Sequence, residues 1–320
     1  MKKNFNFKTY YLNEAGQIVE RPIIKNLKSF IPPYFLIKLQ NIKSSYQYRP
    51  YKNILKKNKS YKNSSKEKIC FIVGSGKSLE LENISFLKSE VVFAIHSFCY
   101  HKEFTNIMSN KSVDKFFFQA PLHEPYSRTE WTEYLKELES ILPKNTKKIF
   151  GLNSYKDSIF SILKENSLFK NDEIIWNFTN IINEYDDYSF NKRHLDISAN
   201  IWKAGTGSIL ALINALYMGF DKIYLIGLDH DYLLHKYGEA RSKDLRENIL
   251  AKKEAKLLNQ DDYVSNQKVM LSTAKIFLQY ERINKLFPNK IVNTSQSSLL
   301  DVFPKKSLKQ IEDEIQNAIS

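Results

Sequence analysis

Short apolar segments alternate with longer segments of helical spacing along most of this 320-residue chain, and this alternation limits its fold most strongly. The first apolar segment is the uninterrupted run at 69–73, and five more strand candidates follow it, at 91–96, 114–119, 147–151, 221–226 and 289–293. Helical spacing occupies the intervals at 129–142, 154–166, 205–219 and 268–287. Because parallel strands need crossover connections, the pattern predicts an α/β fold with a mostly parallel, Rossmann-like sheet and helices on both faces.

The chain divides into three parts by composition. Residues 1–66 form a basic, aromatic leader, and residues 67–304 contain all the strand candidates. Residues 305–320 have the apolar spacing of a closing helix. Within the middle part, residues 233–268 are polar and weakly periodic, so we expect them to form a lid.

The net charge of +13 belongs to the leader. Residues 1–68 contain sixteen basic and three acidic side chains, and the other 252 residues contain equal numbers of both. A neutral body with a basic leader argues against an enzyme that acts on nucleic acid, whose active face would be positive.

The leader suits the surface of an anionic membrane, because its apolar cluster at 30–37 lies among lysines. An arm that binds nucleic acid and a solvated linker remain the alternatives. No run approaches the roughly 18 apolar residues of a spanning helix, and Cys70 and Cys99 lie beside strand-like runs, as reduced thiols of cytosolic proteins do. We expect a cytoplasmic protein, peripheral on the inner face of the cytoplasmic membrane.

Ligands of open α/β sheets bind beyond the carboxyl ends of the strands, so the residues that follow each strand are the candidate site. Gly74, Ser75 and Gly76 follow the first strand, where glycines let backbone N–H groups approach a phosphate. The motif is neither a Walker loop nor a complete dinucleotide fingerprint, because Phe71 and Leu79 occupy the positions of the required glycines.

A second glycine-rich turn opens the helix expected at 205–219. Gly205, Thr206 and Gly207 follow Lys203, and the turn would offer N–H groups and the positive end of the helix dipole to an anion. Tight packing of the helix start explains the same residues equally well.

Acidic and imidazole side chains follow the strand at 221–226. Asp229, His230 and Asp231 have the chemistry of a general acid or base, and Asp-x-Asp also fits a metal site. His230 and His235 are the best candidates for a general base. Ser297 and Ser298 follow the last strand and suit hydrogen bonds to a base or sugar, although a plain polar loop would look the same.

Over about 67–303 the chain resembles the bacterial sialyltransferases of glycosyltransferase family 42 and the related MptE-like proteins. The latter include motility-associated glycosyltransferases and a pterin diphosphokinase. The resemblance rests on five stretches in the family's order, namely 71–79, 93–98, 117–121, 205–229 and 297–303.

Family 42 enzymes are metal-independent, inverting transferases that move a nonulosonic acid from a CMP donor to a glycan. The resemblance therefore implies a CMP-sugar donor, a glycan acceptor and no divalent metal or other cofactor. It places the following residues around the donor: Gly74, Ser75 and Gly76 at the nucleotide, His96 and Gln119 beside it, Thr206 and Gly207 near the cytidine or phosphate, and Ser297 and Ser298 near the cytosine or ribose.

Two features depart from the family pattern. Tyr237 matches one of two tyrosines that hold the leaving phosphate, but Asp231 stands where the other belongs. The family's catalytic histidine in the lid has no counterpart at 261–267, so His230 or His235 would be the base, with Lys203 and Tyr237 at the phosphate.

The leading hypothesis is a glycosyltransferase that moves a CMP-activated acidic sugar to a capsule, lipooligosaccharide or flagellin acceptor. The run 229–232 is closer to the MptE-like branch, which keeps open a Mg²⁺-dependent diphosphokinase acting on a pterin, with Asp229 and Asp231 as ligands. A non-catalytic, membrane-peripheral scaffold is the third hypothesis. We expect no nucleic-acid partner, and a homo-oligomer is compatible with the sequence.

Overall fold

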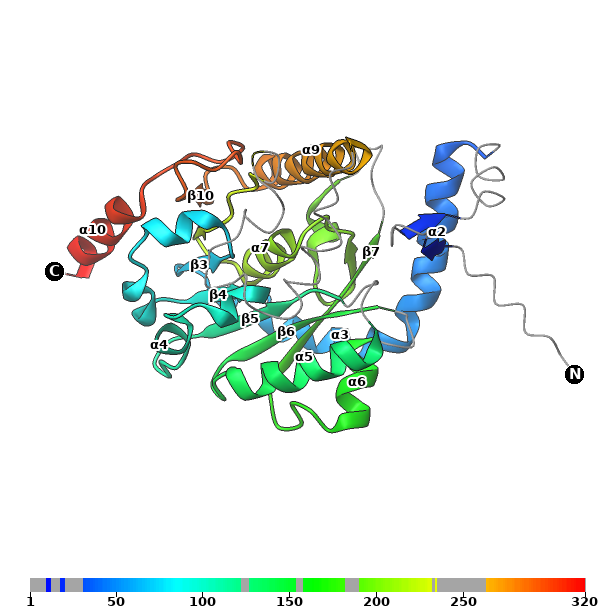
Figure 1. The fold of residues 1–320 in the computed structure, drawn as a ribbon, viewed down its shortest axis with the longest axis horizontal. Helices are drawn as coiled ribbons and strands as arrows, with labels where there is room; N and C mark the ends of the chain where they lie inside the picture. Colours follow the sequence, from blue (N-terminus) through cyan, green and yellow to red (C-terminus); the bar gives the residue numbers. More distant parts are fainter. Residues whose placement is uncertain are drawn as a thin grey trace, which may run out of the picture.

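A computed structural model describes residues 10–12, 18–20, 31–121, 127–153, 158–181, 190–231, 234 and 263–319. Its centre is one eight-stranded, all-parallel sheet with the order β10-β9-β3-β4-β5-β6-β7-β8 (Figure 1). The strands are β3 Ile69–Val73, β4 Val92–Ile95, β5 Lys115–Gln119, β6 Lys147–Leu152, β7 Ile174–Ile181, β8 Asn200–Trp202, β9 Lys222–Ile226 and β10 Ile291–Asn293. The predicted α/β fold with a Rossmann-like sheet is confirmed.

Helices cover both faces of this sheet. On one face lie α7 (Gly207–Met218) and α9 (Tyr263–Leu286), and on the other lie α4 (Phe104–Met108), α5 (Arg128–Ile141) and α10 (Leu308–Ile319) (Figure 1). Helix α6 (Ile159–Asn166) packs beside α5 and β6. The 3-10 helices are η1 Arg49–Tyr51, η2 Lys57–Tyr61, η3 Lys77–Leu81, η4 Ser85–Ser89, η5 His96–Tyr100 and η6 Lys192–Leu195.

Helix α7 is buried almost all round, because it lies between the sheet and α9. Its one amide side chain, Asn214, is fully buried and pairs with the fully buried Asn177 of β7. Asn214 Nδ2 also donates to the Leu210 carbonyl at 2.8 Å. The two amides satisfy each other, which is the condition for burying polar groups between a helix and a sheet.

All six strands expected from the sequence are present, with ends within two residues of the predicted ones. Two strands were not predicted, β7 and β8. Asn177 and Asn180 interrupt the apolar run of β7, and β8 has only three residues. The helix expected at 154–166 begins at Ile159, and Ser158 caps it through its hydroxyl.

The leader is not separate from the body over the part that the structure describes. Residues 31–66 form α2 (Pro33–Tyr48), η1, α3 (Lys52–Lys56) and η2, and both α helices pack against β7. Leu55 is fully buried, and Asn58 donates to the carbonyls of Trp176 (2.7 Å) and Ile197 (2.8 Å). The boundary expected at residue 66 therefore does not divide a free arm from a folded domain.

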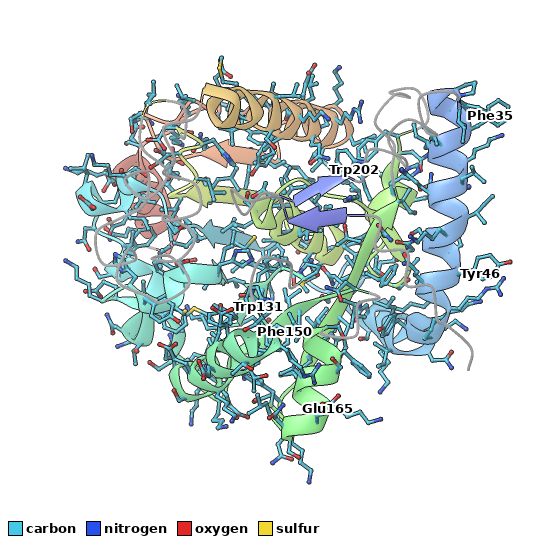
Figure 2. The ribbon with its side chains drawn as sticks, turned by 45° about the vertical axis from the view of Figure 1, so that its right-hand side comes forward. Phe35, Tyr46, Trp131, Phe150, Glu165 and Trp202 are labelled. Atoms are coloured by element: carbon cyan, nitrogen blue, oxygen red, sulfur yellow. The ribbon has the colours of Figure 1, made fainter. Side chains whose placement is uncertain are left out.

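Helix α2 stands at the β7 side of the molecule, and Figure 2 shows Phe35 and Tyr46 projecting from it away from the body. Further towards the N-terminus, β1 (Tyr10–Leu12) and β2 (Ile18–Glu20) form an antiparallel pair. The lid expected at 233–268 lies outside the described residues, apart from Leu234 and the start of α9. Across the residues that the structure describes, no helix is long and apolar enough to cross a membrane.

Candidate functional site

The sheet reverses its winding between β3 and β9. From β3 the chain proceeds to β4 on one side, and from β9 it proceeds to β10 on the other, so the loops after β3 and β9 diverge. Such a switch point leaves a crevice at the carboxyl ends of the strands, where doubly wound sheets bind ligands. Three candidate segments converge there: residues 74–78, 229–231 and 295–298.

The glycines after β3 allow that loop to lie against the loop after β9. A Cβ atom on Gly74 would lie 2.6 Å from the Gly227 carbonyl oxygen, and one on Gly76 would lie 2.5 Å from Asp229 Oδ2. The amides of Gly74 and Gly76 donate to the carbonyls of Ile226 and Gly227, each at 2.8 Å. Two of the amides that the sequence offered to a phosphate are thus bonded to the β9 segment.

Asp229 joins the three loops of the crevice. Its Oδ1 accepts hydrogen bonds from the hydroxyls of Ser78 (2.6 Å) and Ser295 (2.7 Å), and its Oδ2 accepts from the Ser78 amide (2.8 Å). The residue is 4% exposed. We call Ser78, Asp229 and Ser295 the Asp229 latch, whose three hydrogen bonds occupy most of the acceptor sites of this buried carboxylate.

Ser298 reinforces the latch from the backbone side. Its hydroxyl contacts the carbonyls of Leu228 and Asp229 at 3.0 Å and accepts from the Leu300 amide at 3.0 Å. Ser298 is buried, whereas the neighbouring Ser297 is exposed at the same edge. Of the two predicted serines, only Ser297 therefore has a side chain that faces solvent.

His230 is buried directly after the latch, with a left-handed backbone (φ 51°). Its Nε2 lies 3.1 Å from the Tyr280 hydroxyl, and its ring meets Phe277 edge to face. Burial lowers the pKa of His230 to about 4, against the opposing effect of the Asp229 charge. The imidazole is therefore neutral at pH 7 and a weak base.

A chain of hydroxyls runs from His230 to the start of α7. The Tyr280 hydroxyl lies 2.7 Å from Ser208 Oγ, and Ser208 Oγ lies 3.2 Å from Thr206 Oγ1. Tyr280 is fully buried on α9, so the chain crosses the core between three elements.

The turn before α7 is fixed by α9. Gln279 accepts from the Gly205 amide at 2.7 Å and donates to the Lys203 carbonyl at 3.1 Å. The Lys203 side chain remains exposed at the carboxyl edge of the sheet. Lys203 thus lies between the end of β8 and the start of α7, where the helix dipole is positive.

His96 lies against the same turn from the other side. A Cβ atom on Gly207 would be 2.7 Å from His96 Cε1, so glycine is needed for this approach. His96 also has a left-handed backbone (φ 42°), stacks on Phe118, and accepts from the Ala120 amide through Nε2 at 2.9 Å. His96 and Gly207 are therefore neighbours.

Gln119 is not brought to this group. Its Oε1 accepts a hydrogen bond from the Tyr134 hydroxyl of α5 at 2.7 Å, and the residue is buried on the face opposite α7. Asp231 follows His230 and is buried. His235 and Tyr237 lie outside the described residues.

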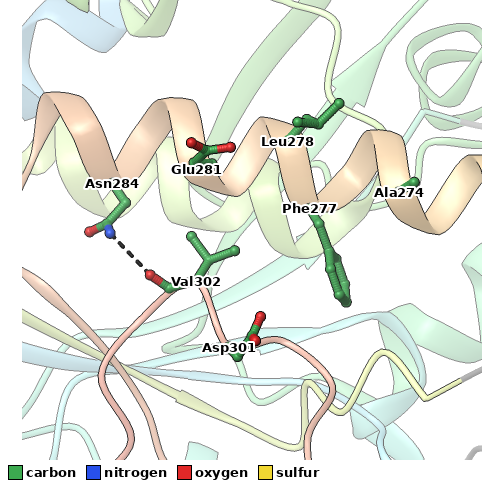
Figure 3. Close-up of a pocket in the computed structure, with 7 residues that line it drawn as sticks. All are labelled: Ala274, Phe277, Leu278, Glu281, Asn284, Asp301 and Val302. Carbon is green, nitrogen blue, oxygen red and sulfur yellow. Dashed lines mark hydrogen bonds between the residues drawn. The ribbon is translucent and has the colours of Figure 1, made fainter.

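A surface groove of about 580 Å³ runs along α9 (Figure 3). Its lining is mainly apolar, with the carboxylates of Glu281 and Asp301 at its edge. Asn284 closes one end by donating to the Val302 carbonyl at 3.0 Å. Phe277 lines the groove and also touches the ring of His230, so the groove and the crevice share one wall.

Sequence reasoning missed Tyr280 and Gln279. Both lie in the middle of a long helix, and nothing in the local sequence distinguishes them from surface residues. Ser78 and Ser295 lie in the polar runs that were singled out, and only their bonds to Asp229 reveal their role.

Together these features define a doubly wound α/β protein with polar loops that converge at its switch point. Neither models of known protein families nor curated proteins match this sequence. Within the described residues no group of three or more His, Cys, Asp or Glu side chains is arranged to hold a metal ion.

Proposed function

We propose that this protein is an inverting glycosyltransferase that uses a CMP-activated acidic sugar and a glycan acceptor. One observation supports the proposal most: segments far apart in the sequence, which overlap four of the five stretches on which the resemblance rests, converge at one switch point. These segments are 74–78, 96, 205–208, 229–231 and 295–298. A generic α/β fold alone would say little about function, because such folds serve many chemistries.

The donor is anionic, whereas the body that would bind it has no net charge. Binding then depends on a few placed groups. The first turn of α7 offers N–H groups and a positive dipole, and Lys203 supplies a cation beside it. Ser75 and Ser297, both accessible, are suited to hydrogen bonds with the ribose and the cytosine.

Transfer needs a base that removes the proton of the acceptor hydroxyl as its oxygen attacks the anomeric carbon. The bond from that carbon to the phosphate oxygen breaks, and CMP leaves with the electron pair. Of the two candidates, His230 has a pKa of about 4 and an Nε2 within hydrogen-bond distance of Tyr280. We therefore assign the base to His235 and a positioning role to His230, with Tyr237 at the leaving phosphate and Asp231 beside the reacting groups.

The Asp229 latch favours the transferase over a Mg²⁺-dependent diphosphokinase. That alternative needs Asp229 and Asp231 as metal ligands, yet both oxygens of Asp229 accept hydrogen bonds from loop residues. The carboxylate has a structural role that needs no cation.

Thermal-shift measurements with CMP, CDP, UDP, GDP and ATP, each with and without Mg²⁺, test the donor class. We expect CMP to raise the melting temperature without Mg²⁺, because a ligand that binds only the folded state stabilises it. Stabilisation by ATP only in the presence of Mg²⁺ would favour the diphosphokinase. A melting temperature that no nucleotide changes would favour the scaffold.

Two pairs of variants test the residue roles. Lys203→Ala should weaken CMP binding about tenfold, whereas Lys164→Ala, which removes an exposed lysine of α6, should not. His235→Ala should lower turnover of a CMP-sugar by roughly 100-fold or more while CMP still binds, with His194→Ala as the control. Full turnover in His235→Ala would refute the assignment of the base.

A further inference from the structure

Helix α2 has apolar and aromatic side chains on its outer side as well as on the side that packs on the body. Towards the body, Ser44 is 1% exposed and accepts from Asn200 Nδ2 at 2.8 Å, Gln47 accepts from Asn180 Nδ2 at 3.0 Å, and the Tyr48 ring contacts Phe178. Five exposed side chains are apolar or aromatic, with exposed fractions of 62% for Tyr34, 57% for Phe35, 55% for Leu39, 55% for Ile42 and 60% for Tyr46. A surface helix normally places such residues inside.

These five residues form one continuous strip, because positions 35, 39, 42 and 46 recur every three or four residues. The helix has 16 residues, which is a length of about 24 Å. Figure 2 shows Phe35 near one end and Tyr46 near the other, on the same outer side. We call Tyr34, Phe35, Leu39, Ile42 and Tyr46 the outer strip.

The charged residues of α2 and of the segment that follows it are all basic. Residues 31–66 contain nine lysines and arginines and no acidic residue. Two of these cations lie over aromatic rings of the strip: Lys38 Nζ is 4.5 Å from the Tyr34 ring centroid, and Arg49 Cζ is 4.3 Å from that of Tyr46. The basic groups therefore flank the apolar surface, as they do where a helix lies in the headgroup region of a membrane.

We propose that the outer strip of α2 docks on the surface of an anionic lipid bilayer, with its apolar side chains among the upper acyl chains and the lysines at the headgroups. The positive charge of residues 31–66 complements an anionic bilayer, which favours the bilayer as the occupant. A second copy of the chain would bring two clusters of nine positive charges together. Tyr34, Phe35 and Tyr46 are rings on which a base could stack, but the aliphatic Leu39 and Ile42 between them suit acyl chains.

Helix α2 differs from a flexible basic tail, because it is part of the folded body. Its hydrogen bonds to Asn180 and Asn200 fix the strip relative to β7 and β8. Docking would thus orient the whole domain at the membrane. The membrane-docking proposal does not rest on the assignment as a glycosyltransferase, since no residue of the candidate site takes part.

Co-sedimentation of the full chain with vesicles tests the proposal, using phosphatidylcholine alone and phosphatidylcholine with about 30% phosphatidylglycerol. We expect binding to the anionic vesicles at least tenfold stronger than to the neutral ones, and a decrease as NaCl rises from about 0.1 to 0.5 M. The double variant Leu39→Gln/Ile42→Gln should weaken binding at least tenfold with an unchanged melting temperature, because both side chains face outward.

The double variant Met270→Gln/Leu271→Gln is the matched control. These side chains are 57% and 61% exposed on α9, so the same loss of apolar surface occurs away from the basic cluster, and binding should not change. Absence of binding to anionic vesicles, or equal binding by Leu39→Gln/Ile42→Gln and the wild type, would overturn the proposal. A wild-type dimer in light scattering that Leu39→Gln/Ile42→Gln dissociates would assign the strip to a second copy instead.

Discussion

The buried imidazole of His230 makes the stability of this protein depend on pH in a defined interval. In the folded chain its pKa is about 4, whereas an exposed histidine has a pKa near 6.5. As the pH falls below 6.5, the unfolded chain takes up a proton that the folded chain does not bind. The free energy of unfolding therefore has its full value above pH 6.5 and declines as the pH approaches 4.

The size of the effect follows from the two pKa values. Each pH unit between them corresponds to about 1.4 kcal/mol, so the loss between pH 6.5 and 4 amounts to about 3 kcal/mol. That is a large part of the roughly 5–15 kcal/mol of a folded domain. Urea denaturation at pH 7.0, 6.0, 5.0 and 4.5 measures it directly.

The variant His230→Asn isolates this contribution from that of other titrating groups. Asparagine tolerates the left-handed backbone at this position (φ 51°) and does not titrate. At pH 7 we expect the variant to be less stable by about 1–3 kcal/mol, because the bond to Tyr280 is lost. That deficit should shrink steadily towards pH 4.5.

Tyr280→Phe is the control for this experiment. It removes the same hydrogen bond but leaves the imidazole in place, so it should lower the stability while the pH dependence persists. A difference between wild type and His230→Asn that stays constant from pH 7.0 to 4.5 would refute the reasoning. The imidazole would then titrate alike in the folded and the unfolded chain.

Three further predictions concern groups that the fold buries, and urea denaturation at pH 7 measures each. Asp229→Asn should cost about 2 kcal/mol, because an NH₂ group replaces one of the two oxygens that accept from the Ser78 amide and from the hydroxyls of Ser78 and Ser295, whereas Asp221→Asn, at an exposed carboxylate, should change stability by less than about 0.5 kcal/mol. Gly76→Ala should cost about 2 kcal/mol or more, since its Cβ would lie 2.5 Å from Asp229 Oδ2, and an unchanged stability would mean that the loops move apart freely. Lys115→Met should cost about 3 kcal/mol, because the buried Nζ donates to three backbone carbonyls at 87–90, and an equal loss in the exposed Lys111→Met would contradict this.

The sheet could be predicted where the sequence signals were local. The strands β3, β4, β5 and β9 are buried on both faces and read as short, almost uninterrupted apolar runs. Strand β7 is only partly buried and contains Asn177, and this buried amide is acceptable only because Asn214 lies opposite. That partner is 37 residues away, so no local pattern reveals it.

The candidate site, like the sheet, could be predicted only in part. The ends of β3, β9 and β10 could be predicted to meet, because the rule for open parallel sheets depends only on topology. Whether a carboxylate at that edge can bind a ligand depends on contacts between distant segments. Asp229 is bound by Ser78 and Ser295, which are 151 and 66 residues away.

Helix α2 shows why an amphipathic pattern does not by itself give the direction of a face. The spacing of Phe35, Leu39 and Ile42 would suit a helix that buries them in a core. Here these side chains stay exposed, while Ser44 and Gln47 face the sheet and bond to Asn200 and Asn180 at its edge. These bonds join distant segments and are invisible in the sequence.

The first turn of α7 is held from two sides by the two histidines that follow strands β4 and β9. His96 lies against Gly207, and His230 reaches Ser208 through the Tyr280 hydroxyl. Both histidines have left-handed backbones, a conformation that costs a non-glycine residue on the order of 1–3 kcal/mol and that clusters at functional sites. A body without net charge has no general attraction for an anion, so its N–H groups must be fixed in place before the ligand arrives. Under the function that we propose, the strain at these two strand ends is the cost of a rigid helix start, because that start would bind the anionic donor.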